Sequence, residues 1–142
     1  MIALDTNILA RFYIDEANKE AKKQNGIAAM IMGQPALFVA RTVILELEWV
    51  LRGGYGYSRE EVARVLDNLI GLDNITVENW EMVNDALQAY KDGLDFADAL
   101  HLAASRGDLF ATFDTKLAKR AGKLGLKPTV ADANTSIANH KF

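Results

Sequence analysis

Four acidic residues stand out because of where they fall in the apolar pattern of this chain: Asp5, Glu46, Asp98 and Asp114. Two follow short apolar runs, and two lie inside apolar stretches where a charge is costly. Carboxylates gathered from distant segments are the ligands with which proteins hold hard divalent cations such as Mg²⁺ or Mn²⁺. Such an ion activates water and neutralises charge on a phosphoryl group. One site built from these acids therefore predicts hydrolysis of a phosphodiester.

Glu46 and Asp98 are the two acids that are hardest to explain as purely structural. Glu46 lies in an apolar helical stretch with no basic residue three or four positions away. Glu48, by contrast, has Arg52 four residues later, which predicts a solvated surface pair. Asp98 lies in a stretch dominated by alanine and leucine. A lone carboxylate on an apolar face is destabilising unless a cation meets it, so both acids are expected to be functional.

Asp5 and Asp114 each have an ordinary structural alternative. Either carboxylate suits the N-cap of the helix that follows it, and Thr115 competes with Asp114 for that role. Asp95 lies three residues before Asp98, so the two side chains are expected to point the same way. Asp95 is expected to be a helix cap, a group that supports the site or a direct ligand.

A second candidate feature is a basic helix face that follows Asp114. Its members have the i, i+3, i+4, i+7 spacing of one helical stripe and are Lys116, Lys119, Arg120 and Lys123. Such a stripe suits the phosphate backbone of a nucleic acid. The simpler alternative is a solvated helix face.

The composition narrows the possible chemistry. The chain has no cysteine and two histidines, which excludes disulfides, thiolate metal sites and cysteine nucleophiles and argues against a histidine-rich zinc site. His101 is expected to be structural. A net charge of −3 gives no support for a general nucleic-acid binder. Without a signal peptide or a stretch able to span a bilayer, a cytoplasmic protein with no membrane partner is expected.

Apolar runs alternate with helical stretches in a way that predicts how these residues are positioned. Strands are predicted at residues 2–4, 37–40, 75–77, 109–112 and, more weakly, 128–130. Helices are predicted at 17–32, from Thr42 as cap to 54, after a capping box at Ser58, and at 80–90, 96–105 and 115–123. The alternation predicts an α/β fold with a parallel sheet covered on both faces. The site is then expected at the carboxyl ends of the strands, where Asp5 and Asp114 fall.

Four short segments together carry a family resemblance. They are Leu4-Asp5-Thr6-Asn7, Leu45-Glu46-Leu47 with Val50-Leu51, Asp95-Phe96-Ala97-Asp98-Ala99-Leu100 and Thr112-Phe113-Asp114. In this order and spacing, they make the sequence resemble the PIN-domain family, specifically the VapC-type toxins of prokaryotic toxin–antitoxin pairs. The match extends over nearly the whole chain, as expected for a single PIN-like nuclease domain over residues 1–142.

The resemblance implies a three-layer α/β/α fold with a central parallel sheet of four to five strands. It also implies a Mg²⁺- or Mn²⁺-dependent endoribonuclease whose catalytic and metal-binding quartet is Asp5, Glu46, Asp98 and Asp114. Asn7 and Thr112 match positions that support the acids, and the role of Asp95 is left open. The implied partners are an RNA substrate, a second copy of the chain and an antitoxin peptide that lies across the active-site groove.

Two other classes of function compete with this hypothesis. A phosphatase of the haloacid-dehalogenase type needs an Asp-x-Asp motif after its first strand, and its second Asp transfers a proton. Here that position is Asn7, which cannot transfer the proton, so this class is disfavoured. The second alternative is a non-catalytic interaction module that kept the fold, since a fold alone does not prove activity.

Overall fold

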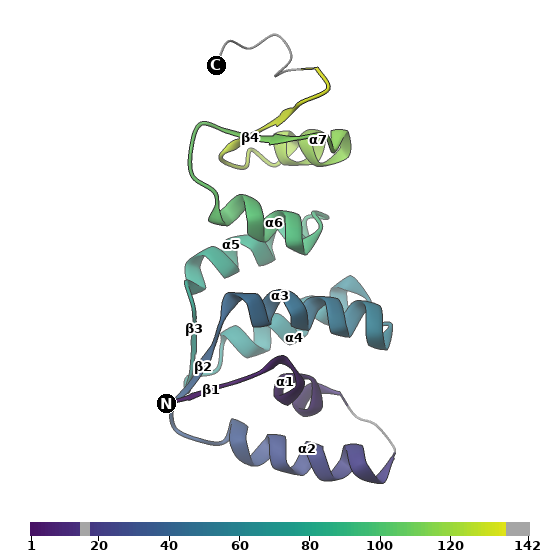
Figure 1. Cartoon of the computed structure of the whole chain (residues 1–142), viewed down its shortest axis with the longest axis vertical. Helices are drawn as coiled ribbons and strands as arrows, with labels where there is room; N and C mark the ends of the chain where they lie inside the picture. The colour runs from purple at the N-terminus through teal and green to yellow at the C-terminus, as the bar shows by residue number, and fades with distance from the viewer. Residues whose placement is uncertain (15–17, 136–142) are drawn as a thin grey trace. The chain divides into compact units, whose positions relative to one another are not determined.

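Five short strands alternate with helices in the part of the chain that the structure describes. The computed structural model describes residues 1–14 and 18–135, so His140 lies outside it. The strands are β1 (Ile2–Ala3), β2 (Leu37–Val39), β3 (Ile75–Val77), β4 (Leu109–Thr112) and β5 (Thr129–Asp132) (Figure 1). Each overlaps a predicted strand. All of the pairings between them are parallel, so the predicted α/β class with parallel strands is confirmed.

The helices also lie close to their predicted positions. Their bounds are α1 (Thr6–Tyr13), α2 (Lys19–Met32), α3 (Arg41–Trp49), a π-helical turn η1 (Val50–Gly54), α4 (Arg59–Ile70), α5 (Trp80–Lys91), α6 (Phe96–Ala104) and α7 (Thr115–Lys123). The predicted capping box is present at the start of α4, where the Ser58 hydroxyl accepts from the Glu61 N–H and the Glu61 carboxylate accepts from the Ser58 N–H. No helix within residues 1–14 and 18–135 is long and apolar enough to cross a membrane.

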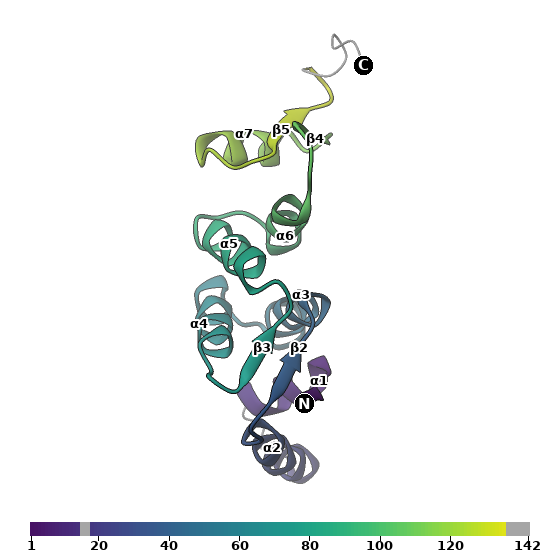
Figure 2. The ribbon, with the colours of Figure 1, turned by 90° about the vertical axis from the view of Figure 1, so that its left-hand side faces the viewer.

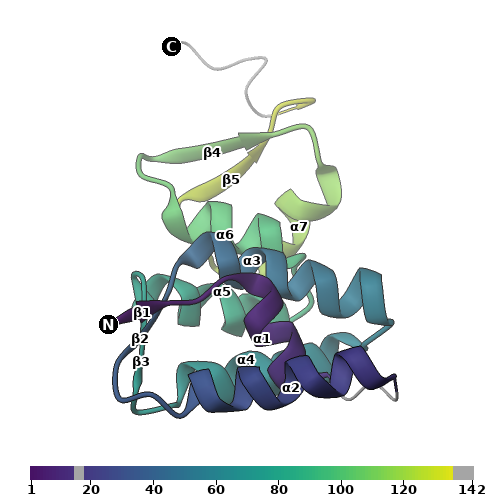
Figure 3. The same ribbon diagram turned by 60° about the horizontal axis from the view of Figure 1, so that its bottom comes forward.

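The chain divides into two compact units, Met1–Trp80 and Glu81–Phe142. In the first unit β2 lies between β1 and β3, and its Leu37 and Val39 are fully buried. The helix α1 contacts both α2 and α3 (Figure 3). The prediction of a single domain stays a prediction.

The second unit contains β4 and β5 with the helix α7 that connects them (Figure 2). Leu117 and Ala121 form the buried side of α7, whereas its basic residues are exposed, so this helix is amphipathic. Tyr90 and Phe96 are both buried, and their rings meet edge to face with centroids 5.5 Å apart. The five strands are thus distributed as three in the first unit and two in the second.

The start of α3 differs from the prediction that Thr42 caps this helix. The helix begins at Arg41, and the preceding Ala40 offers no side-chain cap. A carboxylate oxygen of Glu78, just after β3, instead accepts a hydrogen bond of 3.0 Å from the Arg41 N–H. This residue supplies both an acceptor for a free helical N–H group and a negative charge at the positive end of the helix.

The two glutamates of α3 have exchanged the environments that were predicted for them. Glu48 is buried, with 2% of its surface exposed, because it continues the core stripe of Ile44, Leu47 and Leu51. Its carboxylate accepts a 2.7 Å hydrogen bond from Nε of Arg52, so the predicted pair exists, but its acidic member is buried and only Arg52 is exposed. Glu46 is exposed. The predicted burial of Glu46 on an apolar face is therefore wrong, and burial gives no reason to assign it a function.

These environments predict different effects on stability for two neighbouring substitutions. Glu48→Ala removes a buried partner of Arg52 and leaves a void, so the free energy of unfolding should fall by about 1–3 kcal/mol. Glu46→Ala removes an exposed side chain and should change it by less than about 0.5 kcal/mol. Urea denaturation followed by circular dichroism measures both. Equal decreases for the two variants would contradict the assignment of Glu48 to the core.

Candidate active site

Three acidic side chains of the second unit line one pocket. Asp95, Asp98 and Asp114 surround a cavity of about 210 Å³, which is completed by Gly93, Leu94, Lys116, Leu117 and Arg120. Asp95 is the N-cap of α6 and accepts a 3.1 Å hydrogen bond from the Asp98 N–H. Asp114 is the N-cap of α7 and accepts a 3.0 Å hydrogen bond from the Leu117 N–H. Asp95 and Asp114 therefore lie at the positive ends of α6 and α7.

A hydrogen-bonded loop holds Asp114 in place. The Thr112 hydroxyl accepts a 3.0 Å hydrogen bond from the Asp114 N–H, so Thr112 lies where a supporting residue is expected. The Thr115 hydroxyl donates to Asp132 at 2.9 Å, which ties the start of α7 to the end of β5. Hydrogen bonds from the Asn134 N–H and from Thr115 hold the pKa of Asp132 below its usual range. This carboxylate stays charged and keeps the loop fixed.

The surroundings of Asp98 disfavour its charged form. Partial burial raises the pKa of Asp98, and the nearby charges of Asp95 and Asp114 raise it further, while His101 opposes the shift. The side chain is half-buried, so the burial expected from its apolar stretch is only partial. Neighbouring carboxylates repel one another, and a bound cation would relieve that repulsion.

The basic residues of α7 do not share a single environment. All four are exposed, but only Lys116 and Arg120 line the acidic pocket. The Arg120 guanidinium donates a hydrogen bond to the Gly93 carbonyl, which ties α7 to the turn before α6. Gly93 has a φ of +105°, and a Cβ on this residue would lie 3.2 Å from the Arg120 guanidinium. Lys119 lies near Asp132 and lowers the pKa of that carboxyl.

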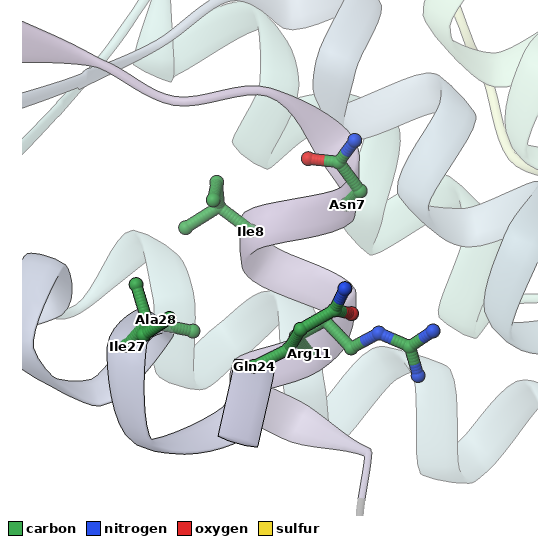
Figure 4. A pocket seen from close by; sticks show the side chains of 6 residues that line it. All are labelled: Asn7, Ile8, Arg11, Gln24, Ile27 and Ala28. Carbon is green, nitrogen blue, oxygen red and sulfur yellow. The ribbon is translucent and has the colours of Figure 1, made fainter. Parts of the chain in front are cut away.

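The remaining predicted site residues belong to the first unit. Asp5 is exposed, and as N-cap of α1 it accepts a 2.7 Å hydrogen bond from the Thr6 N–H. Glu46 is exposed on α3. Asn7 lines a different cavity of about 390 Å³ together with Ile8, Arg11, Gln24, Ile27 and Ala28. Figure 4 shows that these side chains come from α1 and α2.

The structure therefore brings together part of the predicted site. Asp98, Asp114 and Asp95 share one pocket, and the Thr112 hydroxyl accepts a hydrogen bond from the Asp114 N–H. Within each unit, no three acidic or histidine side chains among the described residues converge closely enough to hold a metal ion. The predicted ligands are all carboxylates, and Mg²⁺ and Mn²⁺ prefer such oxygen ligands to the thiolate of cysteine.

Sequence similarity to known proteins shows which family the chain belongs to. Residues 2–123 match the sequence model of the PIN domain. The chain belongs to the PIN-domain family. It is also similar to a VapC ribonuclease from Aquifex aeolicus (strain VF5), with 28% identity over 90 residues, which cover 63% of this chain and 67% of that protein. No solved structure matches the chain.

Membership of the PIN-domain family confirms the three-layer α/β/α fold class. The matched range contains all four acids of the predicted quartet. It ends at the last residue of α7, so the β5 strand that steadies the Asp114 loop lies beyond it.

Sequence reasoning missed three interactions of this PIN domain. The hydrogen bonds of Asp132 and Asn134 to the Asp114 loop join residues that are 17 and 21 positions apart. The local pattern of apolar residues does not predict interactions of this range. The bond between Arg120 and Gly93 spans 27 residues. A glycine just after a helix, followed by an acidic cap, was the available signal for that turn.

The raised pKa of Asp98 leads to a prediction about stability. In metal-free buffer at neutral pH, Asp98→Asn should leave the free energy of unfolding unchanged or raise it by less than about 1 kcal/mol, because solvent screens exposed charges. Asp98 binds its proton more tightly in the folded chain, so its charge destabilises the fold at neutral pH. That cost is relieved as the pH falls through the folded pKa.

Any advantage of the Asp98→Asn variant should therefore disappear below a pH of about 4, near the pKa of an unfolded aspartate. Thermal denaturation of both proteins across this pH range, with a chelator present, measures the effect. A large decrease in stability at neutral pH would instead assign Asp98 a structural role.

Proposed function

We propose that this PIN-domain protein is a metal-dependent endoribonuclease that cuts RNA phosphodiester bonds, and that it is the toxin of a toxin–antitoxin pair. The observation that carries the proposal is the acidic pocket, in which Asp98 and Asp114 lie together and the pKa of Asp98 is raised. The similarity to a VapC ribonuclease supports RNA as the substrate. The proposed catalytic quartet is Asp5, Glu46, Asp98 and Asp114.

The proposed cofactor is Mg²⁺ or Mn²⁺, held by these four carboxylates. The crowding of charge around Asp98 supports a cation, and an all-oxygen ligand set supports a hard one. The ion would activate the attacking water and neutralise charge on the phosphoryl group. Asp95 and Thr112 would keep the start of α6 and the Asp114 loop in position.

Lys116 and Arg120 are proposed to attract and orient the RNA backbone. Both line the acidic pocket, where positive charge reduces the repulsion between the carboxylates and a polyanionic substrate. Lys119 and Lys123 would extend this positive surface along α7. Asn7 is proposed to support Asp5 on the first turn of α1.

We also propose partners and a cellular location for this protein. The resemblance to VapC-type toxins implies a cognate antitoxin protein and a homodimer. We infer that the protein acts in the cytoplasm, where its RNA substrate is found. A non-catalytic PIN-like module is the alternative, and it predicts that no metal-dependent cleavage occurs.

The first test of the proposal is cleavage of total RNA in the presence and absence of Mg²⁺ or Mn²⁺. The wild-type chain should cleave only with metal, and the metal should raise its melting temperature, because binding to the folded state stabilises it. Asp5→Asn and Asp98→Asn should each lower the cleavage rate on the order of 100-fold or more, as expected when a group that stabilises developing charge is removed.

Glu60→Gln is a matched control for these variants, because Glu60 is an exposed acid on α4. It should keep the wild-type rate and the wild-type response to metal. Cleavage that continues in a chelator, or full activity of Asp98→Asn, would refute the metal-dependent mechanism. Absence of cleavage under all conditions would favour the non-catalytic module.

The second test concerns the basic residues of α7. The double variant Lys116→Ala, Lys123→Ala should bind RNA more weakly. The slope of log K against log salt should become shallower by about 0.7 for each phosphate of a single strand that the variant no longer neutralises. Lys119 and Arg120 are avoided because they interact with Asp132 and Gly93, and replacing them would disturb the loops around the pocket.

The control for this test is Lys22→Ala, Lys23→Ala, which removes the same charge from exposed positions on α2. Binding is measured by fluorescence anisotropy in the Asp98→Asn background, so that RNA is not cut. An unchanged slope for the α7 variant, or equal slopes for both double variants, would show that α7 has no specific part in binding.

A further inference from the structure

An exposed aromatic residue, Phe113, is the neighbour in the chain of one acid of the pocket, Asp114. Phe113 leaves 78% of its surface in contact with solvent, although it immediately precedes Asp114. Single exposed apolar residues are common on protein surfaces and carry no meaning by themselves. The position of this ring and the way its backbone is held distinguish it from the others.

Hydrogen bonds fix the backbone on both sides of Phe113. The Asn134 side chain donates to the Phe113 carbonyl at 3.0 Å, and a second hydrogen bond of 2.9 Å ties that same amide group to Asp132. Before the ring, the Thr112 carbonyl accepts from the Ala133 N–H at 2.7 Å. The ring is thus presented to solvent from a fixed backbone, and a phenylalanine side chain has few rotatable bonds to order when it binds a ligand.

The surroundings of Phe113 indicate what kind of ligand the ring meets. Its Cα is about 3.8 Å from that of Asp114, as for any adjacent residues, and the Asp114 carboxylate lines the acidic pocket. Lys116 lines the same pocket and supplies positive charge. A ligand with a flat apolar face and an adjacent anionic group would satisfy both features, and a nucleotide has both.

We propose that Phe113 is a specificity-determining residue, on which an unpaired base of the RNA stacks next to the phosphate that is cut. This inference rests on the proposed ribonuclease function. Bases within a duplex are stacked on one another, so the ring is available only to single-stranded RNA, loops or ends. Stacking on an aromatic side chain tolerates every base, so Phe113 selects for unpaired RNA rather than for a particular sequence.

The test compares variants that keep or remove the ring. The probe is a fluorescein-labelled single-stranded RNA of mixed sequence, and its binding is measured by anisotropy in the Asp98→Asn background. Phe113→Ala and Phe113→Leu should each weaken binding on the order of tenfold, whereas Phe113→Trp and Phe113→Tyr should retain it. The same RNA annealed to its complement should bind the ring-keeping and ring-lacking variants equally.

Leu109→Ala is the matched control, because Leu109 is an exposed apolar residue at the other end of β4. It should leave RNA affinity unchanged. Melting temperatures show whether each variant is folded. If Phe113→Ala is unstable, Phe113→Leu alone is compared with the variants that keep an aromatic ring. Equal affinity of the leucine and tryptophan variants would overturn the proposal. Weaker self-association with unchanged RNA affinity would also overturn it, by assigning the ring to a protein interface.

Cleavage by chains with Asp98 intact separates this inference from the proposed function. If the wild-type protein cleaves and Phe113→Leu cleaves unpaired RNA equally well, the stacking role fails while the nuclease stands. If the wild-type protein does not cleave at all, the nuclease proposal fails. The binding comparison still decides whether Phe113 holds a base, because it involves no cleavage.

Discussion

Carboxylates that cap helices are the interaction on which this structure depends. Asp5, Asp95 and Asp114 each accept a hydrogen bond from a backbone N–H at the start of α1, α6 and α7. A cap of this kind satisfies a backbone donor that would otherwise lack a partner and places negative charge at the positive end of the helix. The geometry that starts the helix also fixes the direction of the acid, so structural and chemical roles are combined in the same side chains.

A carboxylate that caps a helix can still take part in the chemistry of a site. In Asp114 one carboxylate oxygen accepts from the Leu117 N–H, and a carboxylate has further lone pairs available on its two oxygens. In α6 the cap and the partly buried acid are neighbours on the same turn, because Asp95 accepts from the Asp98 N–H. The bonds of Thr112 and Asn134 then hold the loop around Asp114.

The elements were largely predictable from the sequence because short apolar runs, caps and glycines mark their ends locally. The details that were not predictable depend on interactions between distant segments. The stretch around Glu46 and Glu48 is apolar on almost every side, so packing against the rest of the unit decided which glutamate became buried. The cap of α3 comes from Glu78, at a separation of 37 residues, and not from the nearby Thr42. In the site, the sequence predicted the acidic residues and the starts of the helices that carry them. It did not predict the hydrogen bonds that Asp132 and Arg120 make to distant loops.

The capping of α3 by Glu78 has a consequence for how the protein is made on the ribosome. Synthesis proceeds from the N-terminus at roughly 5–20 residues per second, so Arg41 emerges seconds before Glu78. During that interval the nascent α3, which carries Glu46, lacks the carboxylate that accepts from the Arg41 N–H. The helix gains this acceptor only when β3 has joined β2, since Glu78 follows β3 directly. The start of the helix that carries Glu46 therefore gains its full set of hydrogen bonds only when the three-stranded sheet is complete.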